Sequence, residues 1–361
     1  MKRLLKIVLA PIALFLVYFI GTLIFGTLTD YQPEEQIKLT IDGQSNQQLT
    51  SDTITLLSWN IGYSGLGKES NFFYDENYFF TSGNKMIRPT QEFSDTYWTG
   101  IQKVIAENPT DFVLLQEVDV NSDRSYHRNQ YAQLFNTLKG YSGVFAVNFN
   151  AGRVPIPVLE FWNVIGQVYS GLATYSKFKP TDATRFQYPG TFPWPERIFN
   201  LDRCMSVQRY PTRHNKELVV INSHNSAYDK GGSLKQGEMN YLKKFLLDEQ
   251  AKGNYVIVGA DWNQCPPNFQ FDAISPVKDS SYSQINIEQN YLPANWKWVF
   301  DPKFPTNRKL TNTYDPKTTF TTLIDFFLTS PQIEILEVKG IPTNFNYSDH
   351  QPYMVKLKLL K

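Results

Sequence analysis

The chain has 361 residues, of which 42% are hydrophobic and 19% charged, a globular composition that excludes a largely disordered protein. Its 35 basic and 34 acidic residues give a net charge of +1, which excludes capture of nucleic acid by a broad basic field. Only two cysteines are present, Cys204 and Cys265, which excludes a disulfide-rich scaffold. They either pair with each other or remain separate buried thiols.

The first element along the chain is predicted to be an apolar helix. Residues 7–29 contain no charged side chain, and a helix of about 20 apolar residues spans the core of a bilayer. The stretch is longer than the apolar part of a cleavable signal peptide, which is the alternative interpretation. The flanking charges are basic before the stretch and acidic after it: Lys2, Arg3 and Lys6, against Asp30, Glu34 and Glu35. By the positive-inside rule, the sequence predicts a single-pass anchor in the cell membrane at residues 1–29, a polar tether at residues 30–52 and an extracytoplasmic domain at residues 53–361.

Beyond the tether, short β-rich runs alternate with helical patterns, which is typical of an α/β fold. Apolar residues at helical spacing predict helices at residues 131–138 and 239–246. The expected strands cover residues 53–59, 111–115, 172–175, 218–222, 255–259, 324–328 and 353–357. Several of these runs end in polar residues that are able to bind metal ions or phosphate. Active sites of layered α/β proteins are built at such strand ends.

Six short segments at these positions carry the candidate chemistry. Each one alone has an ordinary structural explanation as a turn or a solvated strand end, so their order and strand context are what make them informative. The segments are Ser58-Trp59-Asn60, Gln116-Glu117-Val118, Asn222-Ser223-His224-Asn225, Gly259-Ala260-Asp261-Trp262-Asn263, Ile324-Asp325-Phe326-Phe327 and Ser348-Asp349-His350.

Together these side chains offer what hydrolysis of a phosphoester requires. A hard divalent cation held by carboxylate and amide oxygens neutralises the anionic substrate, and we predict Asn60, Glu117 and Asp349 as its ligands. A general base must activate a water molecule, and we predict His350 in that role with Asp325 orienting it. The remaining side chains are predicted to hold the water and the phosphate: Asp261, Asn263 and His224.

In their order and flanking residues, the six segments resemble the endonuclease/exonuclease/phosphatase superfamily over residues 53–361. The resemblance implies a four-layered α/β sandwich, with two packed, mixed or antiparallel sheets flanked by helices, here preceded by one N-terminal transmembrane helix. It assigns the same roles to the residues named above and implies Mg²⁺ or Mn²⁺ as cofactor. One departure from the family pattern is Ala260, which separates Gly259 from the Asp-x-Asn pair; that pair itself keeps its spacing.

The segments outside this pattern are expected to determine the substrate specificity. Residues 63–98 are rich in aromatic side chains and are predicted to form a loop over the rim of the site, with Phe72, Phe73 and Tyr74 in contact with the substrate. An apolar cover on the edge of the sandwich is the alternative. Lys230, near the start of a helix, and Arg203 are further candidates for binding phosphate, although an ordinary salt bridge explains Arg203 equally well.

These observations predict a metal-dependent phosphoester hydrolase, most simply a phosphodiesterase, that acts outside the cytoplasm. Three classes of function stay open: a lipid or small-molecule phosphoesterase, a nuclease acting on extracellular nucleic acid, and a non-catalytic binding module that kept the fold. The complete set of site residues argues against the third class. The near-zero net charge argues against a nonspecific nuclease, and nothing in the sequence implies a protein partner.

Overall fold

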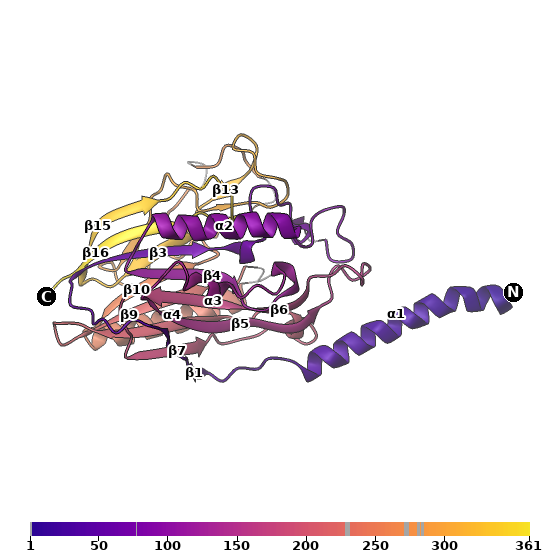
Figure 1. Cartoon of the computed structure of the whole chain (residues 1–361), viewed down its shortest axis with the longest axis horizontal. Coiled ribbons are helices and arrows are strands. Elements are labelled where there is room, and N and C mark those ends of the chain that lie inside the picture. The colour runs from indigo at the N-terminus through magenta and orange to yellow at the C-terminus, as the bar shows by residue number, and fades with distance from the viewer. Residues whose placement is uncertain (1, 77, 228–231, 271–273, 280–281, 283–284) are drawn as a thin grey trace.

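The N-terminal helix projects from one end of the rest of the molecule (Figure 1). The computed structural model describes the whole chain except residues 1, 77, 228–231, 271–273, 280–281 and 283–284. Helix α1 (Lys2–Leu28) contains the segment Leu9–Leu28, which is long and apolar enough to cross a membrane. Within the described part of the chain it is the one helix with this property, although an N-terminal signal sequence meets the same standard.

The rest of the chain is built around two seven-stranded mixed sheets. In spatial order, the first sheet contains β1 (Gln36–Lys38), β7 (Asp182–Gln187), β8 (Cys204–Pro211), β9 (Glu217–His224), β10 (Tyr255–Asp261), β14 (Asp325–Thr329) and β11 (Lys297–Val299). The second contains β15 (Ile333–Gly340), β16 (Tyr353–Leu359), β3 (Thr53–Asn60), β4 (Phe112–Asp119), β6 (Gly166–Ser176), β5 (Ser142–Val154) and β2 (Asp42–Gly43). A small ribbon of β12 (Asn307–Arg308) and β13 (Thr321–Thr322) stands apart from both.

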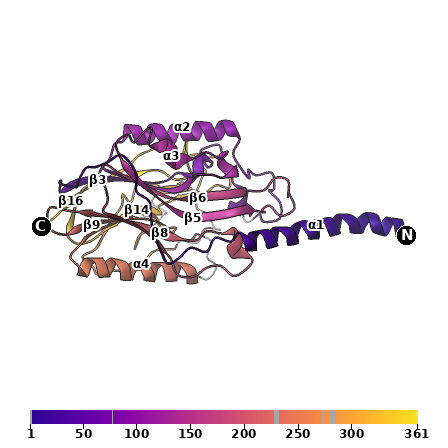
Figure 2. The same ribbon diagram turned by 60° about the horizontal axis from the view of Figure 1, so that its bottom comes forward.

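Helices cover the outer faces of the two sheets, so the molecule has four layers. Figure 2 shows α2 (Gln91–Glu107) and α3 (Gln130–Leu134) on one side and α4 (Ser233–Ala251) on the other. Buried apolar side chains from both sheets, including Leu56, Leu114, Val220 and Ile257, fill the space between the sheets. The predicted four-layered α/β sandwich with one N-terminal apolar helix is therefore confirmed.

The last part of the aromatic segment that was predicted to be a loop is the start of a helix. Residues Gln91–Glu107 form α2, and Thr90 caps its N-terminus by accepting a hydrogen bond from the Phe93 backbone N–H at 3.3 Å. Tyr97 and Trp98 lie on its buried face, and Trp98 packs on the second sheet. The loop prediction was wrong here because the aromatic residues obscured an ordinary amphipathic spacing.

The segment predicted to be a polar tether contributes a strand to each sheet. β1 pairs with β7 at the edge of the first sheet, and β2 pairs with β5 at the edge of the second. These strands are only three and two residues long, too short to show an alternating pattern in the sequence. Residues 36–43 therefore connect the edges of the two sheets and form part of the folded domain.

The two cysteines lie apart in the packing and remain free thiols. Cys204 begins β8 and is buried with Ala146 and Leu172, whereas Cys265 belongs to the apolar cluster under α4. Burial raises the pKa of both thiols, which favours their protonated form. Of the two alternatives, separate buried thiols is the one observed.

A buried ion pair fastens α4 to the first sheet. Glu249 of α4 has a side chain only 1% exposed, and its Oε1 lies 2.7 Å from Nη2 of Arg209 on β8. Lys252 and Asn254 also donate to this carboxylate. Burial alone raises the pKa of Glu249, but these donors outweigh burial and lower the pKa to about 2. The pair thus contributes stability above the ordinary glutamate pKa of 4.5 and loses it as the pH falls toward 2.

Replacing Glu249 with glutamine is expected to lower the free energy of unfolding by about 3 kcal/mol at pH 7, because the mostly buried Arg209 loses its buried partner and keeps only the more exposed Glu217. Urea denaturation of the full-length chain in detergent measures the change, and the gap to the wild type is expected to shrink as the pH approaches 2. Asp248→Asn is the matched control, since its ion pair with Lys244 is exposed. Equal losses in the two variants would contradict the assignment.

Candidate active site

The predicted site residues meet where strands of both sheets end. In the second sheet β3 and β4 run parallel, which places Asn60 beside Gln116. In the first sheet β9 and β10 run parallel, which places His224 beside Asp261. β14 runs antiparallel to β10 and begins at Asp325, directly opposite Asp261. Polar residues at the ends of four separate strands and the start of a fifth are thereby gathered at one end of the sandwich.

A β-bulge directs Glu117 into this centre. The pairing of β4 with β6 shifts register between Leu115 and Val118, and Glu117 adopts a left-handed backbone with φ of 53°. The bulge leaves Gln116 pointing between the sheets, where its amide donates to Oδ1 of Asn222 at 2.8 Å. Asn222 in turn donates to the Leu115 carbonyl at 3.1 Å. This buried amide pair ties the two sheets together directly behind the site.

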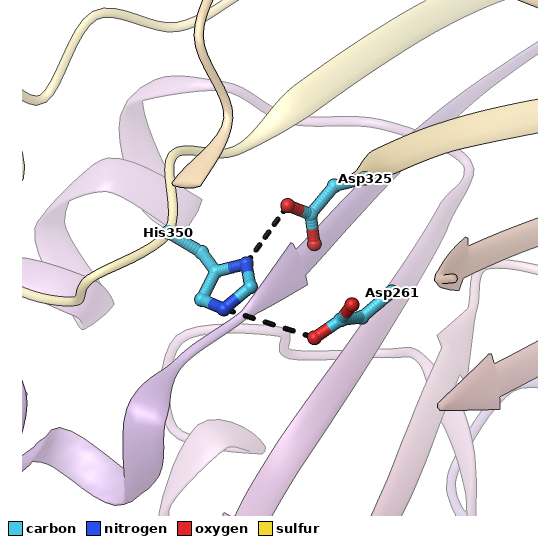
Figure 3. A group of neighbouring side chains, drawn as sticks. All are labelled: Asp261, Asp325 and His350. Atoms are coloured by element: carbon cyan, nitrogen blue, oxygen red, sulfur yellow. Dashed lines mark hydrogen bonds and ion pairs between the residues drawn. The ribbon is translucent and has the colours of Figure 1, made fainter. Parts of the chain in front are cut away.

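His350 lies between two carboxylates, as Figure 3 shows. Its Nδ1 is 2.8 Å from Oδ2 of Asp325, and its Nε2 is 3.7 Å from Oδ2 of Asp261. Burial opposes the charged ring, but the carboxylates of Asp325 and Asp261 raise the pKa of His350 well above its ordinary value. Asp325 fixes the orientation of the imidazole and leaves Nε2 facing the interior of the site.

Asp261 is the hub of the network. Its Oδ2 accepts a hydrogen bond from Nδ2 of Asn60 at 2.9 Å and lies 3.5 Å from Nε2 of His224. Its Oδ1 accepts the backbone N–H of Asn263 at 3.0 Å. Burial raises the pKa of Asp261, but His350, His224 and these hydrogen bonds outweigh burial and lower it. Asp261 is therefore held as a carboxylate in one orientation.

Asn60 links the two sheets across the site. Its Nδ2 also donates to Oε1 of Glu117 at 2.9 Å, while its Oδ1 accepts the backbone N–H of Gly62 at 3.0 Å. The amide oxygen, which the sequence analysis predicted as a metal ligand, is thus occupied by the backbone in this structure. In this arrangement Asn60 orients the Glu117 and Asp261 carboxylates.

Asp349 lies on the same side of the site as Glu117. Ser348 Oγ lies 3.3 Å from the Asp349 carboxylate and also donates to the Asn60 carbonyl at 2.8 Å, which joins the C-terminal segment to β3. Nε2 of His350 is 3.9 Å from the Asp349 carboxylate. Burial, together with the negative charge of Glu117, raises the pKa of Asp349 to about 7. The positive charges of His350 and Arg308 oppose this shift, but burial is its largest cause and keeps the pKa raised.

This donor set fits a hard divalent cation. Four carboxylates, those of Glu117, Asp261, Asp325 and Asp349, converge on one centre, and oxygen-rich sites of this kind suit Mg²⁺ and Mn²⁺. Ligand atoms of Asp261, Asp325 and His350 lie within 4.8 Å of one another. Asp325 and His350 already bind each other, which leaves Glu117 and Asp349 as the ligands whose repulsion a cation relieves.

His224 and Arg203 are neighbours at the edge of the network around Asp261. Burial and the neighbouring Arg203 lower the pKa of His224 to about 3, so its ring is neutral near pH 7. Its Nε2 faces Asp261, whereas the predicted role was a direct contact with the phosphate. Arg203 is half-buried and its Nη1 donates to the His224 carbonyl at 3.4 Å. Both side chains lie next to the network, with His224 supporting Asp261.

The residues predicted to contact the substrate are more scattered. Phe73 is fully buried and packs edge-on against Phe72, so it makes no surface for a ligand. Phe72 and Tyr74 are half-buried, and Phe72 packs with Tyr63 and neighbouring apolar residues. Phe72 and Phe73 thus contribute to apolar packing, and contact of Phe72 or Tyr74 with the substrate stays a prediction. Lys230 lies outside the described residues.

Sequence reasoning missed two polar neighbours of the site. Asn307 of the short strand β12 places its Nδ2 3.0 Å from Nε2 of His350. Lys235, in the first turn of α4, is buried and donates to the Asn263 carbonyl at 3.2 Å. Lys235 follows the glycines that signalled a helix start, so that signal could have identified it. β12 has no pattern in the sequence, and Asn307 therefore had no signal.

Comparison with known proteins gives a family match over most of the chain. Residues 57–350 match the family described as the endonuclease/exonuclease/phosphatase family. A search of curated protein sequences finds no match.

Solved structures resemble the fold at low sequence identity. An endonuclease/exonuclease/phosphatase from Beutenbergia cavernae has a TM-score of 0.54 at 16% identity, covering 85% of this chain and 72% of that one. ANGEL2, a 2′,3′-cyclic phosphatase, gives 0.53 at 14% identity over 91% of this chain and 99% of that one. The human Nocturnin catalytic domain with bound sulfate gives 0.50 at 14% identity, covering 89% of this chain and 97% of that one. Such likenesses establish the fold.

Proposed function

The chain belongs to the endonuclease/exonuclease/phosphatase family, and on that premise we propose that it is a divalent-metal-dependent phosphodiesterase that acts outside the cytoplasm. The observation that carries the proposal is the dyad of His350 and Asp325, which faces Asp261 at the meeting point of the two sheets. Burying carboxylates and imidazoles lowers the stability of the fold, so their burial in this orientation argues for a catalytic role and against a non-catalytic binding module.

The roles of the side chains follow from their contacts. Asp325 holds Nδ1 of His350, so Nε2 is the atom that takes or gives a proton at the reacting phosphate. Asp261, fixed by Asn60 and the Asn263 backbone, orients the attacking water. The neutral His224 keeps Asp261 in place from the other side.

Glu117 and Asp349 would hold the cation, and Mg²⁺ or Mn²⁺ fits their oxygen ligands. When bound, the cation neutralises charge on the phosphoryl oxygens. Around it, the protein supplies a dry, polar centre in which these interactions act at low dielectric. Asp325 and Asp261, which the histidine already contacts, belong to the proton-transfer side of the site.

Hydrolysis assays on the full-length chain in detergent test this proposal. The panel contains a soluble phosphodiester, bis(4-nitrophenyl) phosphate, the matching monoester, duplex DNA, RNA and phospholipid vesicles, each with Mg²⁺ and with Mn²⁺. We expect the diester to be cleaved faster than the monoester. Efficient degradation of duplex DNA at physiological salt would favour a nuclease, and no hydrolysis of any substrate would favour the binding module.

The location is proposed from α1 and the charges around it. Full-length protein is expected to sediment with membranes and to resist release by high salt, because Leu9–Leu28 is long enough to span the bilayer. Protease added from the extracytoplasmic side is expected to degrade the domain after residue 30, since basic residues precede the helix. Recovery of a soluble form that begins near residue 30 would instead identify α1 as a cleaved signal sequence.

A further inference from the structure

The end of the domain that carries the active site also carries exposed apolar side chains. Two loops form this surface: the loop at 155–165 between β5 and β6, and residues 78–82 of the insertion after β3. They are joined by backbone hydrogen bonds from Val158 to Phe79 at 3.1 Å and from Leu159 to Phe80 at 2.9 Å. We call this surface the aromatic tip; its exposed side chains are Tyr78, Phe79, Phe80, Leu159, Phe161 and Trp162.

The register of the second sheet places the tip at the active-site end. β4 ends beyond Glu117, and its antiparallel neighbour β6 begins there, with Asp119 opposite Ser170. The start of β6 is fixed to the loop after β4, because the Gln167 backbone N–H donates to Asp123 at 2.9 Å. The loop that precedes β6 therefore extends past the end of β4, in the same direction as the site.

The tip also lies beside the apolar helix. The ring of Tyr18 on α1 is 5.4 Å from the ring of Phe161. Arg153, at the base of the tip, donates to the Phe161 carbonyl at 2.8 Å and to the Tyr18 hydroxyl at 3.4 Å. Tyr18 precedes the end of α1 by about ten residues, or about 15 Å along the helix axis. Tyr18 lies near the middle of Leu9–Leu28, so with this segment across the bilayer the tip lies within the outer leaflet.

A second contact places another exposed aromatic side chain near the end of α1. Trp194 is 54% exposed, and its indole N–H donates to Thr27 at 3.1 Å. Trp162, in the tip, is 73% exposed. Tryptophan and tyrosine favour the interfacial layer of membranes, where the ring is apolar and the polar group remains hydrated. The exposed aromatics thus continue the apolar surface of α1 onto the folded domain.

We propose that the aromatic tip inserts into the outer leaflet of the membrane and that the substrate is a phosphodiester presented at the surface of that leaflet, a phospholipid headgroup. The inference rests on the proposed hydrolase function and on α1 as a membrane span. Apolar side chains exposed next to a span gain free energy by leaving water for lipid.

A cavity beside the tip has room for a headgroup. Its volume is about 550 Å³, and it is bordered by Asn163 from the tip loop and Asp123 from the loop after β4. Lys85, Arg88 and His127 also line it. Lys85 and Arg88 suit an anionic headgroup, whereas His127 faces the Asp123 carboxylate at 3.2 Å.

Spin labels measure the depth of the tip directly. The full-length chain is reconstituted into nanodiscs of phosphatidylcholine with phosphatidylglycerol, and Trp162→Cys and Phe80→Cys are labelled in turn. Both native cysteines are fully buried and are expected to stay unlabelled. Leu336→Cys on β15, at the opposite side of the molecule from α1, is the control (Figure 1).

Labels at positions 162 and 80 are expected to collide with dissolved oxygen and to be shielded from a water-soluble nickel complex, whereas the label at 336 shows the reverse. Aqueous labels at both tip positions would overturn the proposal. Labels shielded from oxygen and from nickel alike would do so too, because a second copy or another protein would then cover the tip. These measurements do not require hydrolysis, so their outcome does not depend on whether the proposed hydrolase function is correct.

The substrate class is tested with a variant that keeps the site intact. Changing Leu159, Phe161 and Trp162 together to serine removes exposed side chains only, so folding is expected to be preserved. Hydrolysis of lipid in the same nanodiscs is expected to fall at least about tenfold, while turnover of soluble bis(4-nitrophenyl) phosphate stays within about twofold. Unchanged lipid hydrolysis would overturn the inference, as would a wild-type enzyme that cleaves the soluble ester but no lipid. Failure on both substrates would count against the proposed function instead.

Discussion

Removal of divalent metal is expected to abolish hydrolysis, and addition of Mg²⁺ or Mn²⁺ is expected to restore it. The expectation rests on the two buried carboxylates of Glu117 and Asp349: burial, and then the charge of Glu117, raise the pKa of Asp349 to about 7 although His350 and Arg308 oppose them. Glu117→Gln keeps the hydrogen bond from Asn60 but removes a charge. Since changes in the shell behind a metal ligand already cost about 10–100-fold in affinity, loss of the ligand charge is expected to cost at least about 100-fold.

Calorimetric titration of Mg²⁺ or Mn²⁺ into the full-length protein measures this affinity independently of activity. Glu107→Gln is the matched control, because this carboxylate is 61% exposed at the end of α2, outside the active-site network. It is expected to bind metal and hydrolyse the diester as the wild type does. Full activity in excess chelator would rule out the metal-dependent mechanism, and unchanged affinity in Glu117→Gln would show that the ligands lie elsewhere.

The sequence was sufficient to predict the layers of the fold and the cluster of site residues. Apolar strands that end in Asn60, Asp261 and His224 are local patterns, and parallel neighbours bring such ends together. The pairing of His350 with Asp325 was predicted from the resemblance to the family, because β14, which begins at Asp325, and β16, which follows His350, belong to different sheets. The order of the segments along the chain did not predict which of their atoms contact one another.

The parts that could not be predicted depend on geometry without a local sequence signal. The bulge that turns Glu117 inward consists of one extra residue in an otherwise regular strand, and its φ of 53° is unusual for glutamate. The direction of the Asn60 amide depends on the Gly62 backbone, which lies beyond the strand. Asn307 reaches His350 from a two-residue strand that no periodicity reveals. Each case depends on tertiary contacts between distant segments.

The positions of the aromatic residues between 63 and 98 were also not predictable from the sequence alone. The sequence analysis assigned one role to the whole stretch around residues 63–98, but the structure divides it into three parts. Phe73 belongs to the interior, Tyr97 to the buried face of α2, and Phe80 to the surface near α1. Burial decides among these roles, and burial depends on the neighbouring β5–β6 loop, which lies far away in the sequence.

Replacing His350 with alanine is expected to lower turnover of the diester by about 10²–10⁴-fold, the usual contribution of a positioned general acid or base. The imidazole is the only titratable group in the described structure that contacts both Asp325 and Asp261, so no neighbour replaces it. KM for bis(4-nitrophenyl) phosphate is expected to change much less than kcat, because the lost interaction belongs to the transition state.

Asp325→Asn separates the orienting role from the proton-transfer role. It keeps a polar group beside Nδ1 of His350 at the position that is now 2.8 Å away, so it is expected to lower kcat less than the loss of the ring does. Added imidazole is expected to restore part of the activity of His350→Ala, where it fills the vacated space, and to leave Asp325→Asn unchanged. His214→Ala is the control, since this ring pairs with Asp52 outside the active-site network. Wild-type turnover in His350→Ala would show that another group moves the proton, and equal rescue of both variants would show that the ring and its carboxylate partner do not act as an oriented pair.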